Sequence, residues 1–262
     1  MRRIASVGHA FFAAMMIALG VIGLVTGDFT PVWQPLLKGV PAHAGLAYLT
    51  AFISLVCGVG LFVERTAAIA ARVLLASLVL WFVLLRVPAI FTAPTAQDSW
   101  SGCGETAVIV AAAWVLYVWF AADWDERRAG FATGERGLRI ARVLYALSMI
   151  VFGEAHFRYI NETAGLVPAW LPFHLGWAYF TGAAFVAAGI AMLAGVWARL
   201  AAALSAAQMG VFTLLVWVPI VASGSREAFQ LSETILSFVL TAAGWVVAES
   251  YRNVSSRAAN RR

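Results

Sequence analysis

Charged residues are scarce in this chain. Only 12% of the 262 residues carry a charge and 62% are hydrophobic, whereas soluble domains have roughly 25% and 45–50%. This composition excludes an ordinary soluble domain and indicates a membrane protein. No stretch alternates apolar and polar residues in the way that predicts a transmembrane β-barrel. The spans should therefore be helices, which satisfy their own backbone groups in lipid.

Cysteine is scarcer still. The two cysteines, Cys57 and Cys103, form no C-x-x-C pair, so the usual equipment for thiol–disulfide catalysis is missing. Cys57 falls inside an apolar run and we place Cys103 in an outer loop, so we expect no disulfide between them. Among the histidines and carboxylates named below as candidate ligands, no two lie three or four residues apart on one helix, and the sequence therefore predicts no metal site.

Eight apolar runs are long enough to cross a bilayer as helices, which takes about 20 residues each. They can be drawn at residues 4–26, 44–63, 67–91, 105–122, 138–157, 174–195, 198–221 and 231–248. The first run has no small-residue cleavage site at its end, so we expect a retained span and not a signal peptide. The predicted fold class is all-α: a polytopic membrane protein with eight transmembrane helices and both termini on one side.

The basic residues predict which side that is. Fourteen lysines and arginines fall on the side of the termini, and four (Lys38, Arg86, Arg158 and Arg226) fall on the other. By the positive-inside rule, both termini should be cytoplasmic, in a bacterial inner (plasma) membrane. The net charge of +5 is mostly this topological signal; it favours contact with anionic membrane lipid and gives no indication of nucleic-acid binding.

The chain carries an internal repeat. Residues 41–50, PAHAGLAYLT, align without a gap with residues 172–181, PFHLGWAYFT, and the match continues at Val87-Pro88 and Val218-Pro219. Because each unit holds four spans, an even number, the units should be parallel and related by an axis along the membrane normal. We therefore predict a first four-helix repeat at 1–122, a cytoplasmic linker at 123–139, a second repeat at 140–251 and a basic tail at 252–262.

Ionisable side chains gather at the predicted outer end of the fifth span. Glu154 and Arg158 are four residues apart and share a helix face, so an ion pair is the economical interpretation. The alternative is a ligand or proton-handling site, which is the usual reason for an ionisable residue inside a membrane. His156 lies between them, and the first repeat has no ionisable residue at the place that matches Glu154, which suggests one site per chain.

Further polar and aromatic residues fall at the same membrane side. His43 and His174 begin the second and sixth spans, either bonding loop carbonyls or binding a ligand. Glu105 and Glu233 are predicted at the N-termini of the fourth and eighth spans, where the helix dipole favours a carboxylate with or without a function. Three aromatic residues would form either a pocket wall or an interfacial belt: Trp170, Trp177 and Tyr179.

One segment of the second repeat resembles a known family. The order Phe152-Gly153, His156-Phe157, Val167-Pro168-x-Trp170-Leu171-Pro172 and Trp177-x-Tyr179-x-Thr181-Gly182 resembles the DoxX-like family of small four-span membrane proteins. The resemblance covers about 140–248, and it implies a tandem fusion of two such units. Members are associated with thiosulfate:quinone oxidoreductase subunits, with redox complexes that protect against oxidative stress, and with proteins that mature or escort other membrane proteins.

We therefore expect a protein that binds a quinone or similar lipophilic small molecule near the periplasmic face, as a subunit or accessory of a redox system with a partner subunit. The expected ligand-binding residues are Glu154, His156, Arg158, His174, Glu233, Trp170, Trp177, Tyr179, His43 and Glu105. Two alternatives stay open: a membrane scaffold or chaperone for a partner protein, and a small-solute transporter. The sequence does not say whether any reaction is catalysed.

Overall fold

The computed structural model describes residues 6–34, 42–224 and 228–252. Within these ranges the chain forms helices and turns and no strand. The long helices are α1 (Val7–Thr26), α2 (His43–Phe62), α3 (Ala67–Trp81), α5 (Gln97–Phe120), α7 (Gly134–Arg158), α9 (His174–Ala194), α10 (Ala198–Phe212) and α12 (Ala228–Ser250). The short elements are η1 (Pro31–Trp33), η2 (Phe82–Arg86), α4 (Val87–Thr92), α6 (Asp123–Arg128), α8 (Ile160–Gly165), η3 (Thr213–Trp217) and α11 (Val218–Ala222).

Among the described residues, eight helical spans are long and apolar enough to cross a membrane, which confirms the predicted fold class. Most bounds fall within a few residues of those expected from the sequence. Their outward faces carry large hydrophobic side chains, among them Leu80, Leu204 and Leu214, each about 60% exposed. Such faces would be costly in water and are suited to lipid chains.

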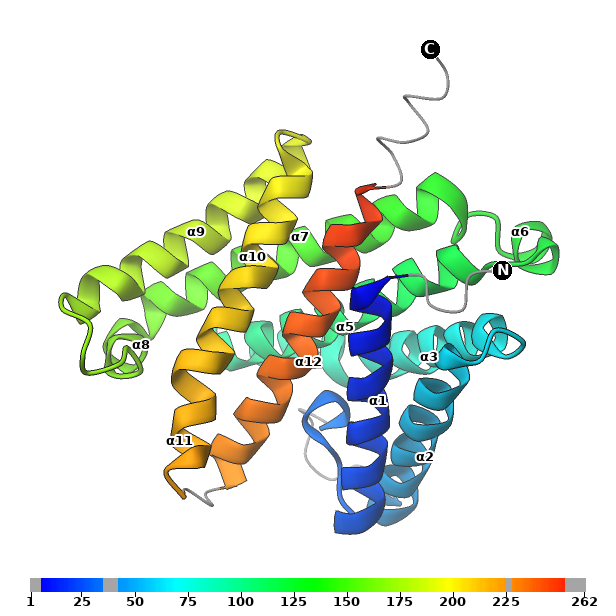
Figure 1. Cartoon of the computed structure of the whole chain (residues 1–262), viewed down its shortest axis with the longest axis horizontal. Coiled ribbons are helices and arrows are strands. Elements are labelled where there is room, and N and C mark those ends of the chain that lie inside the picture. Colours follow the sequence, from blue (N-terminus) through cyan, green and yellow to red (C-terminus); the bar gives the residue numbers. More distant parts are fainter. Residues whose placement is uncertain (1–5, 35–41, 225–227, 253–262) are drawn as a thin grey trace.

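The long helices pack in chain order. Each of α1, α2, α3, α5, α7, α9, α10 and α12 contacts the next, and α12 returns to contact α1 (Figure 1). Helices α5 and α12 also contact each other, and α5 is the most deeply buried of the eight spans. The core is therefore centred on α5, around its buried run from Val108 to Ala113.

The two ends of the described chain meet. The N–H of Gly8 in α1 donates to the carboxylate of Glu249 in α12 at 3.2 Å, and the start of α1 lies beside the end of α12 (Figure 1). We call this end of the bundle the terminal face. The opposite end, where the cavity described in the next section lies, is called the cavity face. The described ends thus share one side, as an even number of crossings requires.

Glycines allow the closest helix contacts. A Cβ on Gly20 would lie 2.5 Å from the backbone nitrogen of Leu55, and one on Gly153 would lie 2.5 Å from the carbonyl oxygen of Gly182. No side chain fits at these distances, so α1–α2 and α7–α9 approach nearly backbone to backbone. This arrangement fits the small-residue seams expected between helices in lipid, where van der Waals packing drives association.

The third and seventh spans are both interrupted by a π-helical turn. In η2, the N–H of Val87 donates to the carbonyl of Phe82, five residues back, and Pro88 follows. In η3, Val218 donates to Thr213 in the same way, and Pro219 follows. A proline has no N–H to donate and its ring clashes with the carbonyl four residues earlier. The wider turn removes that clash and re-aims the side chains beside it.

Local geometry recurs at the offset of 131 residues seen in the sequence. His43 and His174 each begin a helix, and each follows a residue with left-handed backbone: Ala42 (φ 52°) and Phe173 (φ 59°). The two π-helical turns begin at Phe82 and Thr213, again 131 residues apart. The parallel arrangement of two whole repeats stays a prediction.

The fourth span begins earlier than predicted. Helix α5 starts at Gln97, eight residues before Glu105, because the polar segment Gln97–Ser101 joins the helix. Cys103 therefore lies in a helix and not in an outer loop, and it is buried. Both cysteines are free, which confirms that they do not pair.

The predicted linker is only partly a solvated segment. It contains α6, and its last residues, from Gly134, belong to α7. Asp125 of α6 is fully buried and receives two hydrogen bonds from Arg72 of α3, from Nε at 2.7 Å and from Nη2 at 2.8 Å. The linker is thereby fixed to the bundle. Lys38, Arg226 and the tail from residue 253 lie outside the described residues.

Candidate functional site

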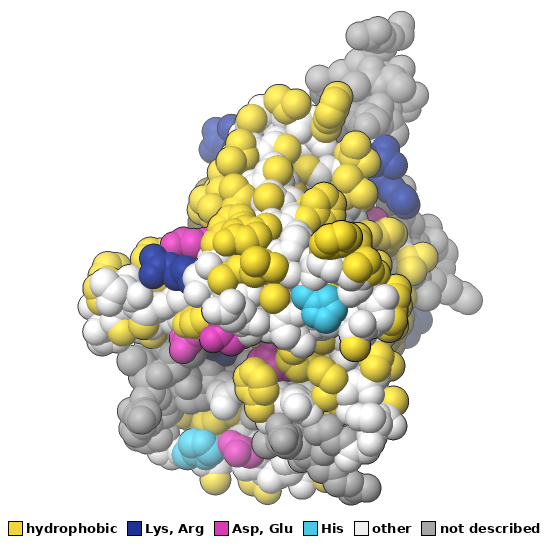
Figure 2. Space-filling model, turned by 90° about the vertical axis from the view of Figure 1, so that its left-hand side faces the viewer, with side chains coloured by type: hydrophobic (Ala, Val, Ile, Leu, Met, Phe, Trp, Pro, Cys, Tyr) yellow, Lys and Arg dark blue, Asp and Glu magenta, His cyan; other side chains and the backbone are white. Residues whose placement is uncertain are grey.

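A cavity of about 380 Å³ lies at the cavity face, between η1, η2 and the early turns of α5 and α12. We call it the Arg86 cavity. It is lined by Pro31, Gln34, Arg86, Asp98, Ser101, Gly102, Glu105, Ser232, Glu233 and Leu236. Residues from both predicted repeats thus meet here. On the face shown in Figure 2, several acidic side chains lie together near the middle, below a largely hydrophobic surface.

Arg86 is the buried cation of this cavity. Its residue is only 3% exposed, and it ends the π-helical turn that precedes Pro88. Its Nη1 donates to the carbonyl of Gly102 and its Nη2 to that of Pro31, each at 3.2 Å. The Nε–H has no partner among the described residues. Because a guanidinium has five N–H groups in a planar fork, Arg86 keeps donors beyond the two that position it.

Two glutamates and an aspartate line the same cavity as Arg86. Glu105 of α5 and Glu233 of α12 both line the cavity, and the carboxylate of Glu105 interacts electrostatically with Glu233, Arg86 and Asp98. Neither glutamate forms a salt bridge within 4.0 Å in the described chain. Three carboxylates against one guanidinium give the cavity a negative balance when all are ionised.

Asp98 is held by a neighbouring helix. Its Oδ1 accepts a hydrogen bond of 2.8 Å from the hydroxyl of Tyr159, which follows α7. A tyrosine hydroxyl is protonated at neutral pH, and this hydrogen bond raises the pKa of the Tyr159 phenol further. Gln97 makes a second link, donating from Nε2 to the carbonyl of Val151 at 3.3 Å. The first turn of α5 is thus tied to α7.

Glu105 is not at a helix N-terminus, contrary to the sequence prediction. It lies in the third turn of α5, which starts at Gln97, and the dipole effect falls off within the first turn. Glu233 lies in the second turn of α12, which starts at Ala228. Capping therefore does not explain these two carboxylates, and a role in the cavity becomes the better interpretation.

The predicted group at the end of the fifth span lies elsewhere. Glu154 and Arg158 form an i,i+4 pair, with Nε donating to Oε1 at 3.0 Å, and both side chains are about half exposed. His156 is directed away from them: its Nδ1 bonds the carbonyl of Phe152 at 2.7 Å and its ring contacts Phe185. The structure thus favours the simple ion pair, and none of the three lines the Arg86 cavity.

The predicted histidines and aromatic residues are also apart from the cavity. His43 is exposed and lies 3.5 Å from Asp28, and His174 is partly exposed. Trp170, Trp177 and Tyr179 are 40–69% exposed, as residues of an interfacial belt would be. Of the ten residues predicted for the site, the structure brings together Glu105 and Glu233.

Sequence reasoning missed Arg86. The sequence pattern shows it only as one of the four basic residues on the predicted outer side. The signal was its position inside the apolar run 67–91, two residues before a proline. An arginine within a membrane span is costly, and it marks a functional candidate by default.

Comparisons with known proteins do not assign the chain to a family. No family model, no curated protein and no solved structure gave a significant match. The resemblance to the DoxX-like family therefore stays a prediction from the motif in the second half, and function has to be argued from the geometry of the Arg86 cavity.

Proposed function

We propose that this membrane protein binds a quinone or a similar neutral, hydrogen-bonding ring in the Arg86 cavity, as a DoxX-like subunit or accessory of a redox system. The observation that carries the proposal is a buried guanidinium with spare N–H donors in one cavity with two carboxylates that form no salt bridge with the described residues. Buried charges are retained at such a cost chiefly where they serve a site.

The charge balance selects the class of ligand. Even with one glutamate protonated, an oxyanion would meet two carboxylates among Asp98, Glu105 and Glu233 and a single arginine to offset them, so repulsion disfavours it. A metal ion is not favoured either, because the described residues contain no group of three or more suitable ligands. A neutral ring with carbonyl oxygens needs donors on one side and proton-exchanging groups on the other, and the cavity offers both.

Different residues would supply the hydrogen-bond donors and the proton-exchanging groups. Arg86 would donate to a carbonyl oxygen of the ring, while Glu105 or Glu233 would hold a proton at the opposite oxygen. A bound quinone would supply the capacity to take up two electrons, delivered by a partner subunit, together with two protons. Leu236 and Pro31 add apolar surface to the lining. The volume of about 380 Å³ lies within the usual range for small-molecule pockets, roughly 300–1,000 Å³.

The orientation follows from the basic residues. The sequence predicts fourteen arginines on the side of the termini; if that side is cytoplasmic, the cavity face points to the periplasm of a bacterial inner membrane. The ligand would then exchange protons on the periplasmic side.

The test is to extract the purified protein with organic solvent and measure quinone by its redox difference spectrum. We expect roughly one quinone per chain for a single pocket. Arg86→Gln should weaken binding of a short-chain quinone, followed by tryptophan fluorescence, by about tenfold or more, because a hydrogen bond from a charged donor is lost. Glu154→Gln is the matched control, since it removes an exposed carboxylate of the same membrane side.

Two outcomes would count against the proposal. One is a protein that carries no quinone and binds none on titration. The other is an equal loss of binding in Arg86→Gln and Glu154→Gln, which would place the ligand elsewhere. Co-purification with one partner protein and no ligand would instead favour the scaffold alternative.

The transporter alternative gains no support from the interior. Polar side chains between the helices of the second half already have partners within the protein: the hydroxyls of Tyr145 and Ser205 share a hydrogen bond of 3.0 Å, and Gln208 Nε2 donates to the backbone carbonyl of Thr181 at 3.0 Å. A solute path needs polar groups that are free to contact the solute. These groups instead serve helix packing.

A further inference from the structure

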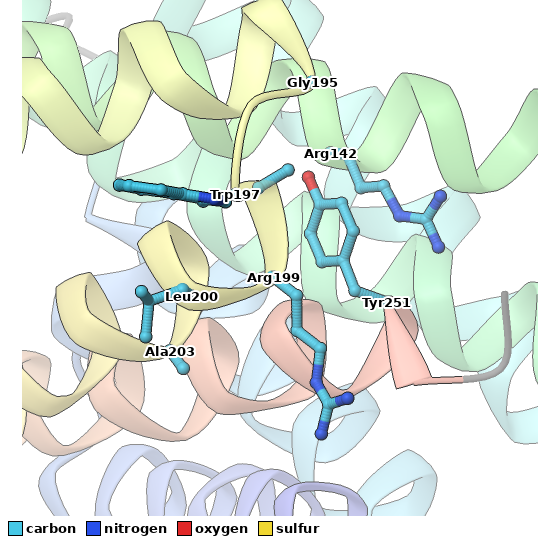
Figure 3. Close-up of a pocket in the computed structure, with 8 residues that line it drawn as sticks. Arg142, Gly195, Trp197, Arg199, Leu200, Ala203 and Tyr251 are labelled. Atoms are coloured by element: carbon cyan, nitrogen blue, oxygen red, sulfur yellow. The ribbon is translucent and has the colours of Figure 1, made fainter. Parts of the chain in front are cut away.

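A groove of about 850 Å³ lies at the terminal face, at the turn between α9 and α10. Its lining includes Arg142 of α7, Tyr251 after α12, and Trp197, Arg199, Leu200 and Ala203 around the start of α10. Figure 3 shows the Tyr251 ring between α10 and α7, with its hydroxyl toward the α9–α10 turn and the Trp197 ring on the far side from Arg142. The groove is separate from the Arg86 cavity, at the other end of the bundle.

One wall of the groove is rigid. Arg142 donates from Nε to the hydroxyl of Ser250 at 3.1 Å and from Nη2 to the carbonyl of Ser250 at 2.7 Å. Its guanidinium also stacks over the Tyr251 ring, 4.3 Å from the centroid. Glu135 lies 3.8 Å from Nη1 and offsets part of this charge.

The other wall offers a free cation. Arg199 is exposed and has no hydrogen bond or ion pair with the described residues. Trp197, just before α10, is 80% exposed and has a left-handed backbone (φ 47°). Arg142 and Arg199 against Glu135 leave the groove with a net positive charge.

Apolar surface runs from these charges along α10. Leu200 and Leu204 are 53% and 60% exposed, and Leu200 and Ala203 line the groove itself. Because α10 belongs to a membrane-length span, this surface faces lipid chains. Tryptophan beside arginine at the end of such a span is typical of the headgroup level.

We infer that this groove binds an anionic phospholipid, with the phosphate at Arg199 and an acyl chain along Leu200 and Ala203. Charge complementarity selects an anion, and the apolar continuation along α10 selects a lipid over free phosphate. The inference does not depend on the quinone proposal, because it concerns different residues at the opposite face.

The experiment uses the full-length protein in detergent, titrated with phosphatidylglycerol or phosphatidylcholine and observed by native mass spectrometry. We expect phosphatidylglycerol to be retained preferentially. Arg199→Gln should reduce that preference by about fivefold, the effect of one arginine near an anionic surface. Arg65→Gln is the matched control, because Arg65 is an exposed arginine of the same face outside the groove.

A second variant tests the binding of the acyl chain and leaves the charges of the groove unchanged. Ala203→Phe fills part of the groove and leaves both arginines in place, so it should also lower phosphatidylglycerol binding. An equal loss in Arg65→Gln and Arg199→Gln would overturn the inference in favour of general surface charge. Displacement of the lipid by millimolar inorganic phosphate would overturn it in favour of a simple anion site.

Discussion

Glu249 near the end of the last helix accepts a hydrogen bond from the backbone N–H of Gly8 in the first turn of the first helix, at 3.2 Å. The two residues are 241 positions apart, and Glu249 is only 5% exposed. The first N–H groups of a helix have no partner within it, so this carboxylate satisfies one of them. It also lies where the helix dipole favours a negative charge. The contact closes the sequence of helix pairs from α1 round to α12.

Replacing this carboxylate should weaken the contact between α1 and α12. We expect Glu249→Gln to lower the free energy of unfolding by about 1–2 kcal/mol, because a charge-assisted hydrogen bond becomes a neutral one. Thermal unfolding in detergent, followed by circular dichroism, measures the change. Glu64→Gln removes an exposed carboxylate at the α2–α3 turn and should shift the midpoint little. Equal midpoints for the two variants would contradict the role given to Glu249.

The pair Arg72–Asp125 predicts that the stability of the folded protein decreases at acidic pH. The hydrogen bonds from Arg72 are the main reason that the pKa of Asp125 is lowered, and the N–H of Ala122 and the hydroxyl of Tyr117 add to them. A carboxyl whose pKa is lower in the folded state stabilises the fold above its unfolded pKa of about 3.9. That stability is lost as the pH falls through the lower, folded value.

The unfolding temperature should therefore decline below about pH 4, and less so in Asp125→Asn. Above that pH, Asp125→Asn should cost about 1 kcal/mol, a modest value because the Arg72 side chain is 34% exposed and partly screened. Asp123→Asn is the control, since Asp123 is exposed on the same short helix. Parallel pH profiles for wild type and Asp125→Asn would show that the pair does not control acid stability.

Much of the fold could be predicted because lipid imposes simple requirements. Apolar runs of sufficient length predicted the eight spans. The Arg86 cavity could not be predicted in the same way. Arg86 is held by carbonyls of Gly102 and Pro31, two other segments of the chain, and hydropathy contains no information on such contacts. Likewise, hydropathy does not indicate the first two turns of α5, because the residues there are polar.

The glycine contact between α7 and α9 can be tested against a glycine that has room. A Cβ on Gly153 would lie 2.5 Å from the carbonyl oxygen of Gly182, whereas one on Gly45 in α2 would meet nothing within 4 Å. Gly153→Ala should therefore destabilise the protein by about 1–3 kcal/mol through overpacking. Gly45→Ala should be neutral or stabilise by up to about 1 kcal/mol, since alanine is the better helix former. Thermal unfolding of both variants tests this prediction. An unchanged midpoint for Gly153→Ala would mean that α7 and α9 can move apart freely.

The most informative measurement is a double-mutant cycle between Arg86 and Glu105. Arg86→Gln should destabilise by about 2 kcal/mol, because it removes two hydrogen bonds from a charged donor and takes away the cation that offsets the charge of Glu105 beside Glu233. Adding Glu105→Gln removes one of these like charges, so the double variant should be more stable than Arg86→Gln alone, with a coupling of about 1–2 kcal/mol. Arg86→Gln combined with Glu154→Gln should be additive, since Glu154 is exposed and paired with Arg158. If both double variants were additive, Arg86 would be a packing residue only, held by its two carbonyls, and the carboxylates would have no electrostatic role in the cavity.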